Sequence, residues 1–241
     1  MSIRRLRSLV CIATTLLFAV ACGHAQQNYV GRYSAYVGFA DIDSPILGLN
    51  EQGFHAQFGV NTKTWLGFGG DYSVARGGDI LTPNLLPASL QAQIGGAEAA
   101  YIAAGLLPPN YTLRLRTDAS TQTFGAGPQV AYRRFTRATL FAHPSFGALR
   151  EHAVPRPADP FQKVVVTQLA PAGYKTDWTA TYGVGGGGEF IVNHHLTLRG
   201  QMEIVWNHPF NDILAEGRWT FRYAVGPSFQ FGRNVPRSGR P

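Results

Sequence analysis

Cysteine is almost missing from this chain of 241 residues. Only Cys11 and Cys22 are present, and both fall within the first 25 residues. The sequence predicts that these 25 residues are removed on export, so the mature chain contains no cysteine. Exported domains often depend on disulfides. This chain must therefore gain its stability in another way.

The first 25 residues have the features of a secretory signal peptide. An apolar run over residues 9–21 is too short to cross a bilayer as a helix of the mature protein. Small residues at positions 23 and 25 fit cleavage before Gln26. An alternative is lipoprotein processing at Cys22, where Ala19 stands in place of the usual leucine. The positive end of the leader consists of Arg4, Arg5 and Arg7.

Charged residues and long apolar runs are scarce as well. Charged residues make up 15% of the chain, and the formal net charge is +7. The basic residues are scattered: of 21, three lie at positions 4, 5 and 7 and three at 233, 237 and 240. No lysine-rich face results, so nucleic-acid binding is not expected. After the leader, no segment is apolar over a length that would form a membrane helix. A membrane protein without such helices has one architecture left, a closed β-barrel.

What the chain has in abundance is alternation of apolar and polar residues. The clearest case is the segment 218–231, where every second residue is apolar and mostly aromatic, and the residues between are polar or small. It is longer than the nine to eleven residues, roughly, that a tilted membrane strand needs. We interpret it as the closing strand of a barrel. Its apolar face consists of Trp219, Phe221, Tyr223, Val225, Pro227, Phe229 and Phe231.

Seven further segments alternate in the same way, which gives eight predicted strands. The residues Asp41 to Pro45 are expected to end the first strand. Connections alternate between short and longer ones, as in outer-membrane barrels with short periplasmic turns. The predicted fold is an all-β, eight-stranded, antiparallel up-and-down transmembrane barrel over residues 26–241, with 233–241 as a periplasmic tail. The predicted strands are 29–40, 53–60, 65–76, 121–133, 138–150, 177–191, 196–206 and 218–231.

Two long insertions interrupt the strands. The first, at about 77–119, contains an alanine-rich segment at 88–105 without proline, bounded by Pro87 and by Gly105. These are helix start and stop signals. We expect one helix, or two short ones divided at Gly95-Gly96, on the barrel mouth. The second insertion, 152–176, carries four prolines and is expected to be a loop.

The polar face is rich in glycine and carries charges of both signs. Solvent-facing strands seldom carry so many glycines, whereas a narrow lumen needs small residues. The polar face is therefore predicted to line the lumen, although a soluble lipocalin-like barrel with the opposite arrangement also alternates. The expected interior network is Arg32, Asp71, Arg133, Glu189, Arg199, Glu203 and Arg222. The expected lipid-facing aromatic residues are Trp65, Trp178, Trp206, Trp219, Phe221, Tyr223, Phe229 and Phe231.

The glycine-rich runs 124–133 and 182–190 and the segments 195–199 and 225–231 resemble those of small outer-membrane barrels. The family is that of the opacity proteins and of the transmembrane domain of outer membrane protein A. The resemblance implies a Gram-negative outer membrane, contact with its lipid, and a last strand read by the barrel-assembly machinery. Ten residues follow Phe231 here, which departs from the usual terminal aromatic residue.

Signals for chemistry are weak. His143 and Ser145 share one predicted face, as a lipid A-modifying barrel enzyme would require, but an interior histidine held by hydrogen bonds explains them better. The pair His194-His195 is expected to be a polar turn, and no cofactor or metal ligands are predicted. The expected role is structural, adhesive or surface-interacting and not enzymatic, with a lumen filled by side chains and an extracellular partner that the sequence does not identify. A soluble barrel that binds a hydrophobic molecule is a further alternative.

Overall fold

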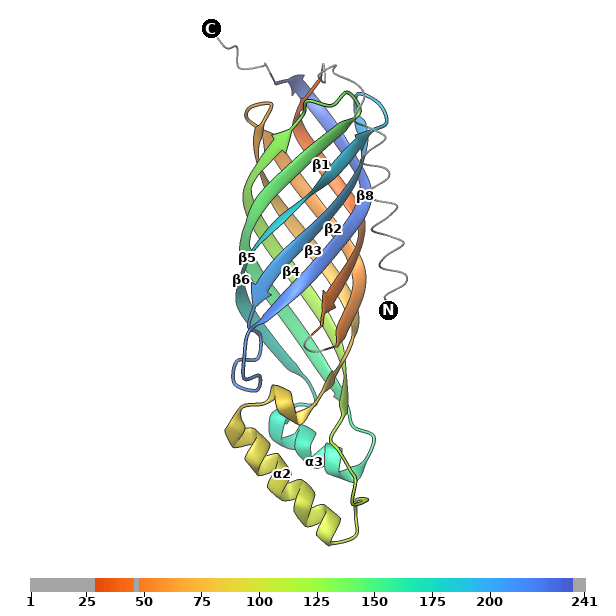
Figure 1. The fold of residues 1–241 in the computed structure, drawn as a ribbon, viewed down its shortest axis with the longest axis vertical. Coiled ribbons are helices and arrows are strands. Elements are labelled where there is room, and N and C mark those ends of the chain that lie inside the picture. Colours follow the sequence, from red (N-terminus) through yellow and green to blue (C-terminus); the bar gives the residue numbers. More distant parts are fainter. Residues whose placement is uncertain (1–28, 46–47, 236–241) are drawn as a thin grey trace.

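Eight antiparallel strands form a closed barrel in this computed structural model, which describes residues 29–45 and 48–235 (Figure 1). Each strand pairs with the next, and β8 pairs with β1, so the ladder has no open edge. The predicted eight-stranded up-and-down barrel is confirmed. The predicted signal peptide lies outside the described residues. The strands are β1 Gly31–Ser44, β2 Leu49–Asn61, β3 Leu66–Leu81, β4 Leu115–Tyr132, β5 Ala138–Arg156, β6 Lys175–Ile191, β7 Leu196–Asn207 and β8 Arg218–Asn234.

The alternation in the sequence becomes two faces of the barrel wall. In β8, Arg222 and Ala224 are buried while Tyr223 and Val225 are exposed. Side chains on one face of neighbouring strands come together across the wall, for example Trp206 opposite Trp219. Because most lumen-facing residues are polar or small and the large aromatic side chains point outward, a lipocalin-like arrangement with its apolar face inside is wrong.

Several strands run further than predicted at one end of the barrel. The first strand does not break at Asp41 but continues to Ser44, because Ile42 is buried in the lumen and keeps the alternation going. Strands β3 and β4 remain paired as far as Leu81 and Leu115. The acidic residues of β1 are tolerated there because they point outward, and Asn50 of β2 donates a hydrogen bond to Asp41 (3.5 Å).

The connections differ between the two ends of the barrel. Residues 62–65, 133–137 and 192–195 form short turns at the end where β1 begins and β8 finishes. Longer connections, at 82–114, 157–174 and 208–217, leave the opposite end, together with the short β1–β2 connection at 45–48 (Figure 1). Residues 82–114 and 157–174 there carry a short 3₁₀ helix, η1 Pro83–Leu85, and two α-helices, α2 Ala88–Ala103 and α3 Pro160–Leu169.

These helices form a helical cap with its own apolar core. The expected helix at 88–105 is present and continuous, because Gly95 and Gly96 face open space while Ile94 is buried in the core. Aromatic ring contacts join the two insertions, with Tyr101 tilted and Tyr111 edge-on against Phe161. The buried core residues are Leu86, Ile94, Leu107, Leu113, Leu115, Phe161, Val165, Val166 and Leu169.

The expectation of a loop over the whole of 152–176 is wrong, because α3 lies within it. The sequence does hold a start signal: Asp159 accepts a hydrogen bond from the backbone N–H of Gln162 (2.8 Å), and Pro160 follows it in the first turn. The Tyr111 hydroxyl also donates to Asp159 (2.8 Å). Burial raises the pKa of Tyr111 to about 12, so this donor stays protonated. One aspartate thus fixes α3 and ties it to the other insertion.

Replacing Asp159 with alanine is expected to destabilise the cap by about 1–2 kcal/mol, because the helix loses its N-cap acceptor. Limited proteolysis of the folded barrel should then cut within 157–174 faster than in the unchanged chain. Asp159→Asn is the matched control, because asparagine caps a helix as well as aspartate does. Equal cutting of the alanine and asparagine variants would contradict this role for the cap residue.

Candidate functional site

The lumen receives the inward-pointing residues of every strand, and β7 and β8 supply three buried arginines. Arg199, Gln201 and Glu203 come from alternate positions of β7, and Arg218 and Arg222 from β8. All five are at most 7% exposed. Charged groups removed from water are costly unless they are paired. The stability of the barrel therefore depends on which partners each buried charged residue has.

Arg199 is the most heavily contacted of these cations. It forms an ion pair with Glu189 (3.3 Å) and donates to Gln129 (2.9 Å) and Gln201 (2.8 Å). The guanidinium carbon lies 3.8 Å from the ring centroid of Phe141, a cation–π distance. The planar guanidinium suits this set, because it donates in its plane and stacks on its face.

Arg222 holds a second network nearer the middle of the barrel. Its guanidinium forms ion pairs with Asp71 (3.1 Å) and with Glu203, and it donates to Ser73 (2.8 Å). Two histidines flank these carboxylates: His55 Nε2 lies 3.5 Å from Asp71. His143 Nε2 lies 3.7 Å from Glu203. We call Asp71, Glu203 and Arg222 with these two histidines the central network.

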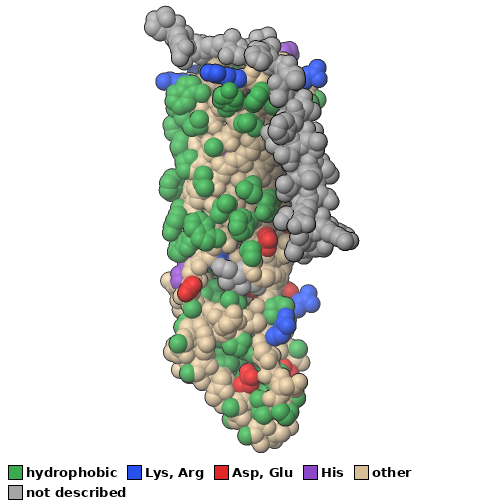
Figure 2. All heavy atoms as spheres, in the orientation of Figure 1, with side chains coloured by type: hydrophobic (Ala, Val, Ile, Leu, Met, Phe, Trp, Pro, Cys, Tyr) green, Lys and Arg blue, Asp and Glu red, His purple; other side chains and the backbone are tan. Residues whose placement is uncertain are grey.

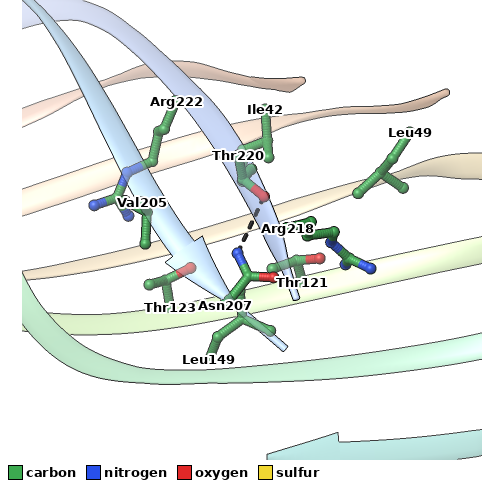
Figure 3. Close-up of a pocket in the computed structure, with 10 residues that line it drawn as sticks. All are labelled: Ile42, Leu49, Thr121, Thr123, Leu149, Val205, Asn207, Arg218, Thr220 and Arg222. Carbon is green, nitrogen blue, oxygen red and sulfur yellow. Dashed lines mark hydrogen bonds between the residues drawn. The ribbon is translucent and has the colours of Figure 1, made fainter. Parts of the chain in front are cut away.

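An uncharged layer of apolar side chains, threonines and Asn207 follows the central network toward the cap. Figure 3 shows a small cavity here, lined on one side by Arg222 and on the other by Arg218, with a hydrogen bond from Asn207 to Thr220 (3.0 Å) between them. The cavity has room for about one water molecule. The apolar side chains around it are Ile42, Leu49, Leu149 and Val205.

Beyond this layer lies a second group of charges, the outer cluster, formed by Glu51, Asp79, Glu151 and Arg218. Arg218 pairs with Glu151, and both are buried. Glu51 is fully buried and Asp79 is partly buried. A second cavity adjoins the cluster beneath the cap, with Asp79, Glu151 and Arg218 in its wall.

The structure places the predicted interior residues in different surroundings. Asp71, Glu189, Arg199, Glu203 and Arg222 all take part in the ion pairs above. Arg133, by contrast, lies at the rim, where it donates to the carbonyl of Thr64 (2.9 Å). Arg32 is exposed and does not belong to the lumen, because the pairing of β1 with β8 shifts register between Gly31 and Tyr33.

His143 and Ser145 do lie on one face, and both are buried. His143 faces a carboxylate of the central network rather than a hydroxyl, which fits an interior structural histidine. His195 packs edge-on against Tyr29 (5.4 Å), and its Nδ1 lies 2.9 Å from the carbonyl of Gln230, so this turn histidine has a local structural role. Within 29–45 and 48–235, no three or more His, Cys, Asp or Glu residues are placed to hold a metal ion.

The outer cluster was missed by sequence reasoning. Glu51, Asp79 and Glu151 all lie just beyond the predicted ends of their strands. Continuing the period of two from the predicted strands puts these three on the lumen face. That signal was present, but the acidic residues and glycines beside it suggested loops.

The outer wall is apolar over most of its height, as Figure 2 shows for one face. The large exposed side chains include Phe146 (61%), Val184 (58%) and Phe39 (53%). The predicted lipid-facing aromatic residues point outward. Six of them are exposed, and Trp206 and Phe221 are half-buried by neighbours on the same face. No helix within the described part of the chain is both long and apolar enough to span a bilayer.

No protein-family model matches the sequence, and no curated protein matches it. Among solved structures, the chain is similar to Neisserial surface protein A, with 12% identity over 83% of this chain and 96% of that one and a TM-score of 0.51. It is also similar to Ail, the attachment invasion locus protein of Yersinia pestis, with 13% identity, 84% and 99% coverage and a TM-score of 0.48. OprG of Pseudomonas aeruginosa gives 11% identity, 86% and 99% coverage and a TM-score of 0.39. With its closed ladder and apolar wall, this chain has the fold of the small eight-stranded outer-membrane β-barrels.

Proposed function

We propose that the protein is an integral outer-membrane protein of a Gram-negative-type bacterium that presents its helical cap outside the cell as a contact surface. The observation that carries this proposal is the combination of an apolar outer wall with a packed cap at one end only. An apolar outer wall of this kind is stable in contact with the hydrocarbon of a membrane. A cap with a core of its own, held by residues such as Phe161, is a rigid unit suited to a structural or adhesive role.

The orientation follows from the connections. Outer-membrane barrels keep short turns on the periplasmic side and long connections outside. Three short turns and both ends of the described chain lie at one end, and the two longest connections lie at the other, which supports an extracellular position for the cap. In this proposal β8 is also the segment that the barrel-assembly machinery engages, because it completes the ladder by pairing with β1.

The proposal includes a lumen filled by side chains, which favours a structural role over a diffusion pore. Eight-stranded barrels have interiors narrow enough for side chains to fill. The central network, the uncharged layer and the outer cluster succeed one another along the axis of this barrel. A lipid A-modifying activity gains no support from His143, because it faces Glu203 inside the lumen.

Accessibility labelling tests the orientation directly. If the leader is cleaved before Gln26, the mature chain has no cysteine, so a single introduced thiol reports one position. Gly96 of α2 faces open space, and we expect Gly96→Cys to react with a membrane-impermeant maleimide on intact cells. Asn193→Cys, in the β6–β7 turn, is the matched control and should react only after lysis. The reverse pattern would overturn the orientation.

Membrane integration is tested separately, on urea-washed outer membranes. The unboiled protein should stay with the membranes and migrate faster than the boiled protein. Release by urea with identical migration would overturn the membrane assignment, whatever the labelling gives. If both tests succeed, cells with 82–114 replaced by a short turn should keep the barrel and lose any surface contact that the cap makes.

A further inference from the structure

The outer face of β3 to β6 carries an aromatic group at the cap end of its apolar wall. Tyr72, Phe124 and Trp178 form it, with ring centroids 5.0 Å apart for the first pair and 6.0 Å apart for the second. Aromatic residues of membrane barrels mark the level where hydrocarbon gives way to lipid headgroups. In the proposed membrane position, the outward residues that follow on these strands toward the cap lie among the headgroups.

Three of these outward residues are arginines. Arg76 follows Tyr72 by four residues on β3. Arg150 of β5 lies opposite Trp178 of β6, and Arg116 lies nearer the cap on β4. Arg76 and Arg116 are exposed and Arg150 is half-buried. Within residues 29–45 and 48–235, none of these three arginines forms an ion pair, so their charges are not balanced by the protein.

A fourth arginine increases the positive charge of this surface. Arg156 lies directly opposite Arg116 in the pairing of β4 with β5. Like charges in this position destabilise a sheet. Asp118 pairs with Arg156 (2.8 Å), which balances only one of the two cations. An anion bound from outside the protein would relieve the remaining repulsion. We call Arg76, Arg116, Arg150 and Arg156 the basic patch.

The basic patch occupies one sector of the barrel and not the whole rim. At the same end of the neighbouring strand β1, the outward positions are occupied by Asp41 and Asp43. Asp41 lies opposite Gln52 of β2, and Gln52 lies opposite Arg76, so the sign of the charge changes across a single strand. This boundary limits the anion-binding surface to β3, β4 and β5.

The surface between Arg76 and Arg150 is uncharged. Ser120 of β4 lies opposite Arg76, and Gln122 of the same strand lies opposite Arg150. The two arginines therefore stand on either side of β4, two residues apart along it. With the usual strand spacing and rise, their α-carbons are about 12 Å apart. Two extended arginine side chains can meet across this distance around one phosphate group, with the hydroxyl and the amide beneath it.

We propose that the basic patch binds a phosphorylated lipid of the outer leaflet, with a phosphate between Arg76 and Arg150 and its acyl chains along the aromatic group formed with Phe124 and Trp178. The guanidinium fork matches the oxygens of a phosphate. A lipid is the occupant because the cations directly adjoin an apolar wall, which a soluble anion leaves unused. This inference rests on the proposed function, since an extracellular cap brings the patch to the outer leaflet.

The first test compares three probes on the mature chain folded in uncharged detergent micelles. They are lipid A with both phosphates, the same lipid A without phosphates, and its phosphorylated sugar without acyl chains. Native mass spectrometry measures the bound fraction and gives each dissociation constant. We expect intact lipid A to bind at least tenfold more tightly than either other probe. Equal binding of the dephosphorylated lipid would overturn the role of the arginines, and equal binding of the sugar would overturn the choice of a lipid.

A double variant then locates the site. Arg76→Gln combined with Arg150→Gln should weaken the binding of lipid A at least tenfold. Arg134→Gln combined with Arg137→Gln is the matched control, because it removes the same charge from two exposed arginines in the short β4–β5 turn at the other end of the barrel. The heat-shift gel checks that each variant is folded. Undiminished binding in the patch variant, or an equal loss in both variants, would overturn the proposal.

Failure of this inference can be told apart from failure of the proposed function. The probe ranking is measured in detergent, so it tests the phosphate site whatever the orientation of the barrel. Labelling of Gly96→Cys only after lysis would place the patch in the periplasm and overturn the outer-leaflet lipid together with the proposed orientation. Normal labelling with an unchanged patch variant would overturn the lipid site alone.

Discussion

An Arg222→Met variant is expected to lose about 3–5 kcal/mol of unfolding free energy. Methionine keeps much of the length of arginine but removes the charge, which leaves Asp71 and Glu203 without their shared cation inside the barrel. The cost arises from these stranded carboxylates more than from the pairs themselves, since removing one partner of a buried pair leaves an uncompensated charge. Urea unfolding in lipid vesicles, followed by the heat-shift gel, measures the change as a lower midpoint.

Arg156→Met is the matched control for this prediction. Arg156 also forms an ion pair, with Asp118 at 2.8 Å, but both side chains are largely in solvent. Exposed pairs contribute about 0–1 kcal/mol, so the midpoint should hardly move. Arg222→Lys is expected to fall between the two, because lysine restores charge without the guanidinium fork. If Arg222→Met and Arg156→Met unfold at the same urea concentration, the central network does not stabilise the barrel.

The second large effect concerns the outside of the same strand. Val225→Arg is expected to cost about 2–4 kcal/mol, the range for an arginine on the lipid face near the midplane. Val225 lies midway along β8, is 52% exposed, and pairs with Phe39 on one side and Gly200 on the other. In water this substitution would be mild. The loss of unfolding free energy in this variant therefore shows whether lipid or water surrounds the wall at Val225.

Val192→Arg provides the comparison. Val192 is as exposed, at 59%, but lies in the short turn between β6 and β7. An arginine near the interface costs only about 0–1 kcal/mol. We expect urea unfolding in vesicles to separate the two variants. Equal stability of the two would mean that the middle of the wall does not contact hydrocarbon, which would contradict the proposed membrane location.

The parts of the fold that the sequence predicted are those where one periodic signal dominates. The closing strand at 218–231 was predicted in full because apolar and polar residues alternate without a break, and the structure adds only three residues to it. The helix α2 was predicted from its proline and glycine boundaries. Packing against α3 then holds it as one helix despite two central glycines, a tertiary contribution that local preference does not contain.

The parts that were not predicted are those where the intrinsic structural preference of a residue differs from the element that the barrel places it in. Asp41 in β1 and Glu151 in β5 are poor strand residues by preference, yet the ladder of a closed barrel carries both. For the same reason the outer cluster was hidden in segments that were expected to be loops. The charged partners within the lumen also could not be paired in advance, because alternation gives the face of a residue but not its height along the axis.

The pairing of β8 with β1 has a consequence for how the chain folds. The two strands that close the ladder lie at opposite ends of the sequence, so contacts such as Phe39 with Val225 have the largest separations in the chain. Contacts of this kind form late and slow folding, because a long loop must be closed first. Until β8 is in place, β1 and β7 each present an unpaired edge. A chain shortened before Arg218 is therefore expected to remain an open sheet that associates through those edges, rather than a smaller barrel.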